Sequence, residues 1–341
     1  MKAQNQAPPT SSGAASSDGA PSTSVLGVMR QKIQQFLAFG SLIALLVFFT
    51  VASPNFMTWS NISGILTSTA VIGILALGTT FVIISGGIDL SLGTGMTLAS
   101  VATGAFLSFM GLPLAIGIIG GILAGALMGF INGFNIAVLK IPPFIATLAM
   151  MLIAQGLALV ISGARPIYFS GVDGFNQLAL GRSLPFVQIP NGVLILFGMA
   201  VIAALLLSRT VLGRYTFAIG SNEEATSLSG INVRRWKLRI YTLSGAFTGM
   251  AGVVLASRLN SAQPAMGLGY ELEAIAAVVI GGTSLAGGKG SIVGTLIGAM
   301  IMSVLTNGLR IMSIPQEWQT VVVGIVILVA VYADNLRRRK E

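Results

Sequence analysis

Long apolar runs separated by short polar segments fill most of the chain. A bilayer core needs about 20 mostly apolar residues per helix, because every backbone polar group must be satisfied without water. The pattern therefore predicts an all-α, polytopic membrane protein with about ten transmembrane helices. The predicted spans cover residues 36–53, 62–84, 90–110, 114–139, 144–161, 192–207, 240–256, 272–280, 292–309 and 316–333. The eighth is too short to cross alone, so we expect a half-helix or re-entrant segment shielded by protein.

The charges between the spans predict the orientation of the chain. Lys and Arg near span ends are retained on the cytoplasmic side. With the N-terminus inside, only four of the 19 Lys and Arg residues fall outside, namely Arg165, Arg182, Arg258 and Arg310. We therefore expect both termini in the cytoplasm, with a disordered tail at 1–30, a transmembrane domain at 31–335 and a basic tail at 336–341.

Composition narrows the classes of function. The chain is 54% hydrophobic and 9% charged, whereas soluble proteins are about a quarter charged. Its net charge of +9 comes from cations set between apolar runs, which indicates topology signals and no nucleic-acid partner. The chain has no Cys and no His, so thiolate nucleophiles, imidazole bases and the usual zinc or haem ligands are missing. We expect no catalytic residue and no bound metal or cofactor, and an intramembrane enzyme is poorly supported.

Two glycine-rich segments, 86–95 and 281–290, resemble each other. They agree at Gly86/Gly281, Gly87/Gly282, Leu90/Leu285, Gly93/Gly288 and Gly95/Gly290. Most of these matches are glycines in a glycine-rich chain, so the repeat is suggestive. An even number of spans separates the segments, so both would face the same side, as in a parallel internal repeat. Transporters use paired, glycine-interrupted segments to line a path with irregular backbone.

The longest polar interruption in the second half covers residues 208–239. Within it, 221–231 has the pattern of a short capped helix, with Ser221 or Asn222 as N-cap, Glu223 and Glu224 in the first turn, and Gly230 as terminator. Taken alone, this segment also fits a solvated cytoplasmic loop.

Several of these motifs resemble a known family. Glu224-Ala225, followed by Gly230, is similar to the Glu-Ala-Ala…Gly cytoplasmic motif of ABC importer permeases, although the second Ala is Thr226 here. Leu-Gly-Arg-Tyr at 212–215, Leu-Ser-Gly-Ile-Asn-Val at 228–233 and the stretch 269–290 look like the ribose-type monosaccharide permeases, as do 86–91 and 144–148. The resemblance covers nearly all of 36–332 and leaves out the N-terminal tail.

The resemblance implies an ABC importer permease fold and an assembly in the bacterial inner membrane. Two permease chains, expected as a homodimer in membrane lipid, would bind a periplasmic sugar-binding protein outside and an ATP-binding cassette subunit inside. ATP and Mg would bind to that subunit, and this chain would conduct ribose or a similar monosaccharide inward. The expected ATPase-coupling residues are Glu223, Glu224, Ala225, Gly230 and Ile231.

A phosphate loop in this chain itself is not supported. The segment 283–290 carries Gly287, Gly288 and Lys289, but a P-loop needs Gly where Thr283 stands and a hydroxyl residue where Gly290 stands. We therefore expect the energy to come from a partner ATPase.

Polar residues in or beside the spans are candidates for the translocation path or its gate. They are Asp89, Ser91, Asn132, Gln155, Glu271, Thr283, Ser284 and Asn307. Asp89 should face protein or a wet cavity; the pattern favours the N-cap of the third span over a path-lining or gate role, and the two are compatible. Glu271 and Glu273 fit cation coupling or simply a helix N-terminus, and the amides fit sugar contacts or interhelical hydrogen bonds.

Other readings stay open. Gly117, Gly121, Gly125 and Gly129 form a small-residue stripe that favours close helix packing, within the chain or at the dimer contact. The main alternative function is a self-sufficient secondary transporter of a small polar solute, for which only Asp89 and the acids near 271 could couple an ion. The sequence does not select one sugar.

Overall fold

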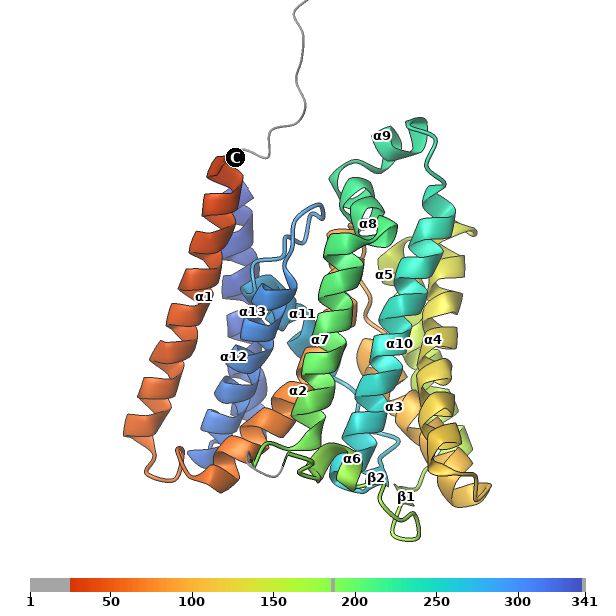
Figure 1. Ribbon diagram of the computed structural model, residues 1–341, viewed down its shortest axis with the longest axis vertical. Helices are drawn as coiled ribbons and strands as arrows, with labels where there is room; N and C mark the ends of the chain where they lie inside the picture. The colour runs from red at the N-terminus through yellow and green to blue at the C-terminus, as the bar shows by residue number, and fades with distance from the viewer. Residues whose placement is uncertain (1–24, 185–187, 339–341) are drawn as a thin grey trace, which may run out of the picture.

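The computed structural model describes residues 25–184 and 188–338, and the side chains of 36–184 and 188–336. The described chain is a bundle of long helices (Figure 1). Its strands, among these residues, are the two-residue segments β1 (Ile167–Tyr168) and β2 (Ser261–Ala262). They pair antiparallel, with Ile167 opposite Ala262, at the end of the bundle away from α9 (Glu223–Leu228).

Each predicted span corresponds to one helix. The first five are α1 (Val25–Ala52), α2 (Trp59–Ile84), α3 (Leu92–Gly104), α4 (Leu114–Ala137) and α5 (Pro143–Ser162). A π-helical turn, η1 (Ala105–Phe109), continues α3. The second five are α7 (Asn191–Arg209), α10 (Val233–Leu259), α11 (Tyr270–Ile280), α12 (Ile292–Ile311) and α13 (Gln316–Arg338). The short helices α6 (Gln177–Leu180), α8 (Val211–Ser221) and α9 lie between the long ones.

The helix lengths support a polytopic membrane protein. Eight of the described helices are long and apolar enough to cross a membrane, and α1 adds a shorter apolar stretch, Phe36–Ala52. The 11 residues of α11 span about 16 Å at 1.5 Å per residue, which is about half of the hydrocarbon core. The prediction of a half-helix at this position is thus confirmed.

Three boundaries differ from the sequence prediction. The expected tail at 1–30 lies outside the described residues up to residue 24, but α1 already begins at Val25. At the other end, α13 continues to Arg338, past the expected boundary at 335. The segment 208–239 is mostly helical, because α8 and α9 lie within it and α10 begins at Val233. Hydropathy marks where a helix is apolar, and these helices continue past their apolar parts.

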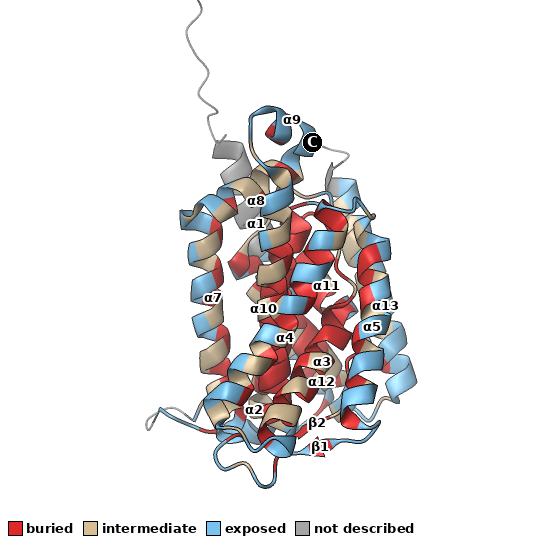
Figure 2. Cartoon of the chain, turned by 90° about the vertical axis from the view of Figure 1, so that its right-hand side faces the viewer, coloured by how far each residue is buried: buried red, intermediate tan, exposed pale blue. Residues whose placement is uncertain are grey.

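The centre of the bundle is α2. Of its most apolar stretch, 94% is buried inside the chain, and residues such as Leu75 and Phe81 are fully enclosed. A helix that is apolar on all sides needs neighbours all round, and α7, α10, α11 and α12 supply them. Figure 2 shows this buried interior, with exposed residues on the outer faces of α5, α7 and α13. The bundle therefore has a closed, packed core.

The glycine stripe of α4 lets it pack closely within the chain. A side chain at Gly125 would overlap the backbone of Gly245 and Gly249, and one at Gly129 would overlap the Tyr241 carbonyl. All three of these neighbours belong to α10. Gly117 and Gly121 of the same stripe face Leu107 of η1 and Thr103 of α3, so the stripe packs α4 on its own chain and these positions are not available for a dimer contact.

The two glycine-rich segments follow two helix ends of the same type. α2 ends with Gly86 at φ +78°, and the Gly86 and Gly87 amides donate to Ile83 and Val82. α11 ends in the same way with Gly282 at φ +93°, and the next amide, of Thr283, donates to Val278. These are the bonds of a Schellman motif. The helix ends thus match Gly86 with Gly282, so the sequence alignment that paired Gly86 with Gly281 is shifted by one residue.

Candidate functional site

The polar segment between α7 and α10 folds into two short helices beyond the end of the bundle (Figure 1). Thr210 caps α8, accepting a bond from the Gly213 amide at 3.5 Å. The start of α1 and the end of α13 lie at the same end of the bundle as α9.

Local capping explains why α9 forms. The Asn222 side-chain oxygen accepts a bond from the Ala225 amide at 2.9 Å, so Asn222 is the N-cap and Ser221 is the last residue of α8. Glu223 and Glu224 occupy the first turn, where the partial positive charge of the helix end favours acids. Gly230 follows the helix at φ +82°, a conformation that glycine adopts without strain. The predicted capped helix is confirmed.

The inner and outer faces of α9 differ. Thr226 is buried, and its hydroxyl donates to the Asn222 carbonyl at 2.7 Å. Glu224 and Ala225 are exposed, and Leu228 is 84% exposed. The residue that departs from the family motif, Thr226, therefore lies on the inner face and leaves the outer surface of α9 unchanged.

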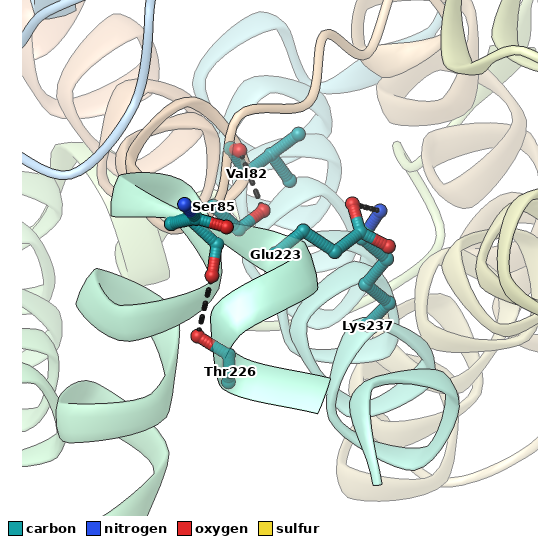
Figure 3. A network of polar contacts seen from close by, with 6 residues as sticks. Val82, Ser85, Glu223, Thr226 and Lys237 are labelled. Carbon is teal, nitrogen blue, oxygen red and sulfur yellow. Dashed lines mark hydrogen bonds and ion pairs between the residues drawn. The ribbon is translucent and has the colours of Figure 1, made fainter. Parts of the chain in front are cut away.

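An ion pair joins α9 to α10. The Lys237 ammonium donates to the Glu223 carboxylate at 2.6 Å, and both side chains are partly exposed (Figure 3). A pair of this kind contributes about 0.2–1 kcal/mol. Its main effect is to fix the direction of α9 relative to the long helix that follows it.

An open hollow of about 630 Å³ lies beside α9. Its lining carries charges of both signs, from Lys140 and Arg234 on one hand and Glu223 and Glu224 on the other. The remaining lining residues are Ser227, Ile231, Asn232 and Val233. Of the five predicted coupling residues, the hollow contains Glu223, Glu224 and Ile231, while Ala225 and Gly230 are exposed on the same short segment. The structure thus collects all five on one surface.

A second polar group is enclosed between α2, α3 and α4. The Asp89 carboxylate accepts bonds from the Ser91 amide at 2.9 Å and the Ser91 hydroxyl at 2.6 Å. That hydroxyl accepts a bond from the Asn132 amide at 2.8 Å. Asp89 is only 1% exposed, so it faces protein as expected. The N-cap prediction is wrong, because Ser91 occupies the cap position of α3 and the backbone amide that Asp89 accepts from is that of Ser91, which lies before the first turn of the helix.

The acids of α11 behave as helix-end residues. Both Glu271 and Glu273 lie in its first turn, and Glu271 accepts a bond from the Gly269 amide at 3.0 Å. Beyond the other end, Thr283 and Ser284 are buried in the loop, and the Ser284 hydroxyl accepts a bond from the Ala286 amide at 3.4 Å. These bonds hold the two ends of α11, and a path or gate role for Glu271, Thr283 and Ser284 stays a prediction.

The remaining candidates stay apart. Gln155 is half-buried on α5 and Asn307 half-buried on α12, and no hydrogen bond of the described residues joins either to the Asp89 group. The eight path candidates thus give one compact cluster, Asp89–Ser91–Asn132, and several separate positions. They do not line a single surface within one chain.

Two residues were missed by the sequence analysis. Leu228 is an apolar residue on a helix expected in solvent, and this mismatch is the sequence signal that distinguishes it. Tyr241 is fully buried on α10, and its hydroxyl lies so near Gly87 that a side chain there would overlap it. Nothing local in the sequence places Tyr241 beside the end of α2.

Comparison with known proteins assigns the family. A family model described as a branched-chain amino acid transport system permease component matches residues 61–331. The ribose import permease RbsC of Escherichia coli K12 is 43% identical over 304 residues, covering 87% of this chain and 94% of that protein. RbsC of Bacillus subtilis 168 is 45% identical over 310 residues, covering 91% and 94%.

A more distant relative is the xylose transport system permease XylH of Escherichia coli K12. It is 34% identical over 373 residues, covering 92% of this chain and 95% of XylH. No solved structure matches the chain. The chain therefore belongs to the family of transport-system permeases, with permeases for ribose and xylose among its relatives.

Proposed function

We propose that this chain is the transmembrane subunit of an ATP-driven importer of ribose or a closely related sugar in the bacterial inner membrane. Its similarity to ribose import permeases extends over most of both chains, which supports a sugar in place of the amino acids in the family description. The observation that carries the proposal is α9, a capped helix held beyond the bundle with Leu228 84% exposed.

The outer face of α9 suits a protein partner. An exposed Leu beside a hollow with charges of both signs offers an apolar anchor and a polar rim, the arrangement found at protein interfaces. We assign this surface to an ATP-binding cassette subunit, which binds ATP and Mg. In this assignment Leu228 and Ile231 supply apolar contact, Glu224 supplies charge, and Gly230 fixes the turn.

The sugar path forms between two copies of the chain. The core around α2 is closely packed with apolar side chains, and the buried Thr79 and Thr80 hydroxyls within it are bonded to carbonyls of α2 itself, so we assign no route for a hydroxylated solute through one bundle. A second permease chain, a homodimer in the simplest case, would supply the other wall. The Asp89–Ser91–Asn132 cluster then holds the break between α2 and α3 and does not contact sugar. A periplasmic sugar-binding protein delivers the substrate at the end that carries β1 and β2.

Reconstitution tests this function. The chain would be tagged in its own host, purified with its ATP-binding subunit and placed in proteoliposomes with ATP inside and the sugar-binding protein with radioactive ribose or xylose outside. Uptake should require both ATP and the binding protein. Uptake driven by an ion gradient through this chain alone would instead establish the self-sufficient transporter.

A further inference from the structure

Three backbone segments from distant parts of the sequence meet directly beneath α9. The first is the end of α2, where Ile84 is the last helical residue. The second is the last turn of α8, at Gly220 and Ser221. The third is the loop that follows α11. The Gly288 amide of this loop donates to the Ile84 carbonyl at 2.8 Å, across more than two hundred residues of sequence.

Glycines make this meeting possible. A Cβ at Gly220 would overlap the Ile84 carbonyl oxygen and lie 2.6 Å from the Gly288 nitrogen. A Cβ at Gly287 would lie 2.8 Å from the Gly220 carbonyl oxygen and 3.0 Å from the Gly86 nitrogen. We name Gly86, Gly220, Gly287 and Gly288 the glycine junction. At Gly220 and Gly287 backbone meets backbone, which a residue with a side chain would prevent, whereas Gly86 and Gly288 adopt positive φ angles that favour glycine.

The junction connects α9 to both helix breaks. Ser221 is followed at once by Asn222, the N-cap of α9. Gly86 leads through Asp89 into α3, and the loop of Gly287 and Gly288 leads into α12. Ser85 closes the α2 end by donating its hydroxyl to the Val82 carbonyl at 2.8 Å, and Figure 3 draws this bond behind the start of α9. The loops that follow α2 and α11 therefore contact the residues directly before α9, the helix that we assign to the ATP-binding subunit.

We infer that the glycine junction transmits displacement of α9 to the ends of α2 and α11, and that Gly220 is the positioning residue at its centre. Flexible side chains can change rotamer and absorb a displacement, whereas close-packed backbone cannot yield without moving its neighbours. The junction therefore moves as one unit, and the helix ends beside it follow α9. This inference rests on the proposed function, because a displacement of α9 requires an ATP-driven partner.

The first test is Gly220→Ala, with Gly198→Ala as matched control. Gly198 is also helical, but a Cβ there meets nothing within 4 Å. Gly220→Ala pushes α8 away from the α2 end and leaves the outer face of α9 intact. In the reconstituted complex, ATPase activity should be kept while sugar imported per ATP falls about fivefold or more, the range of typical coupling energies. Normal import per ATP by folded Gly220→Ala overturns the inference.

The second test holds the junction closed. The chain has no cysteine, so Ser221→Cys with Gly288→Cys is the only possible disulfide. A Cβ at 288 would lie 2.6 Å from the Ser221 hydroxyl oxygen and 3.1 Å from the Ser221 Cα, so the two positions are adjacent and the segments need to part slightly to accommodate a disulfide. The oxidised complex should import sugar as fast as its reduced form, because the two segments move together. Import that stops on oxidation and returns on reduction overturns the inference.

Failure of the inference differs from failure of the proposed function. Gly288→Cys alone measures any cost of a side chain at φ +71°. If Gly220→Ala yields no folded complex, the disulfide result decides whether the inference about the glycine junction holds. If the unaltered chain shows no ATP-dependent uptake, the proposed function is wrong. If uptake is ATP-dependent and either Gly220→Ala imports sugar per ATP as the unaltered chain does or oxidation of the disulfide variant stops import, only the inference is wrong.

Discussion

Removing the N-cap of α9 should weaken binding of the ATP-binding subunit to this chain. Asn222→Ala deletes the oxygen that accepts the Ala225 amide, which costs about 1 kcal/mol at a helix N-cap. A helix of 6 residues has little else to order it. The ratio of ordered to disordered α9 should fall about fivefold, since 1.4 kcal/mol corresponds to about tenfold. Hydrogen exchange of the amides at 225–229 should accelerate by that factor, and half-maximal ATPase stimulation should need more ATP-binding subunit, by at most about fivefold.

Asn232→Ala is the matched control. Asn232 caps α10 in the same way, accepting the Arg235 amide at 3.1 Å, but α10 has 27 residues packed through the bundle. Its cap loss should leave hydrogen exchange of the α9 amides unchanged, and exchange is the readout of this control because Asn232 also lines the hollow beside α9. Asn222→Asp keeps the acceptor and should restore normal exchange. Equal effects of Asn222→Ala and Asn232→Ala, or no change in either, would refute the reasoning.

Three further predictions concern different surfaces. Glu224→Lys or Gly230→Glu should leave an inserted, folded chain that no longer stimulates its ATPase. Normal transport by either variant would show that α9 is not part of the interface. Leu228→Asp should weaken binding of the ATP-binding subunit about tenfold or more in a co-purification titration, because burying a Leu is worth about 1.5–3 kcal/mol. Gly125→Val should lower the thermal stability of the purified chain through overlap with α10, whereas Gly156→Val, which faces open space, should not; equal melting temperatures would contradict the α4–α10 packing.

The fold was largely predictable because a membrane imposes a simple rule on each segment. A run of about 20 apolar residues has to be a helix, so the spans follow from hydropathy alone. The short helix α11 was predictable for the same reason, since 11 residues cannot cross the core. The cap residues Asn222 and Gly230 were predictable because capping depends on neighbours a few residues away.

Contacts between distant segments were not predictable. Asp89 precedes α3 and fits an N-cap locally, but the fold turns its carboxylate to Ser91, which is held in turn by Asn132 on another helix. The stripe through Gly125 predicted close packing without naming α10 as the partner. Gly220 had no distinguishing signal, because its need for a missing side chain comes from Ile84 and Gly288, which only the folded chain brings near.

The position of α9 relative to the membrane and the ATPase is the central claim, and a single cysteine tests it directly. Ser227 is exposed beside the hollow, so Ser227→Cys gives one thiol in a chain that has none. A membrane-impermeant maleimide should label it in inverted vesicles and not in intact spheroplasts, and bound ATP-binding subunit should protect it. Labelling from the outside of spheroplasts, or equal labelling with and without the ATP-binding subunit, would contradict the account.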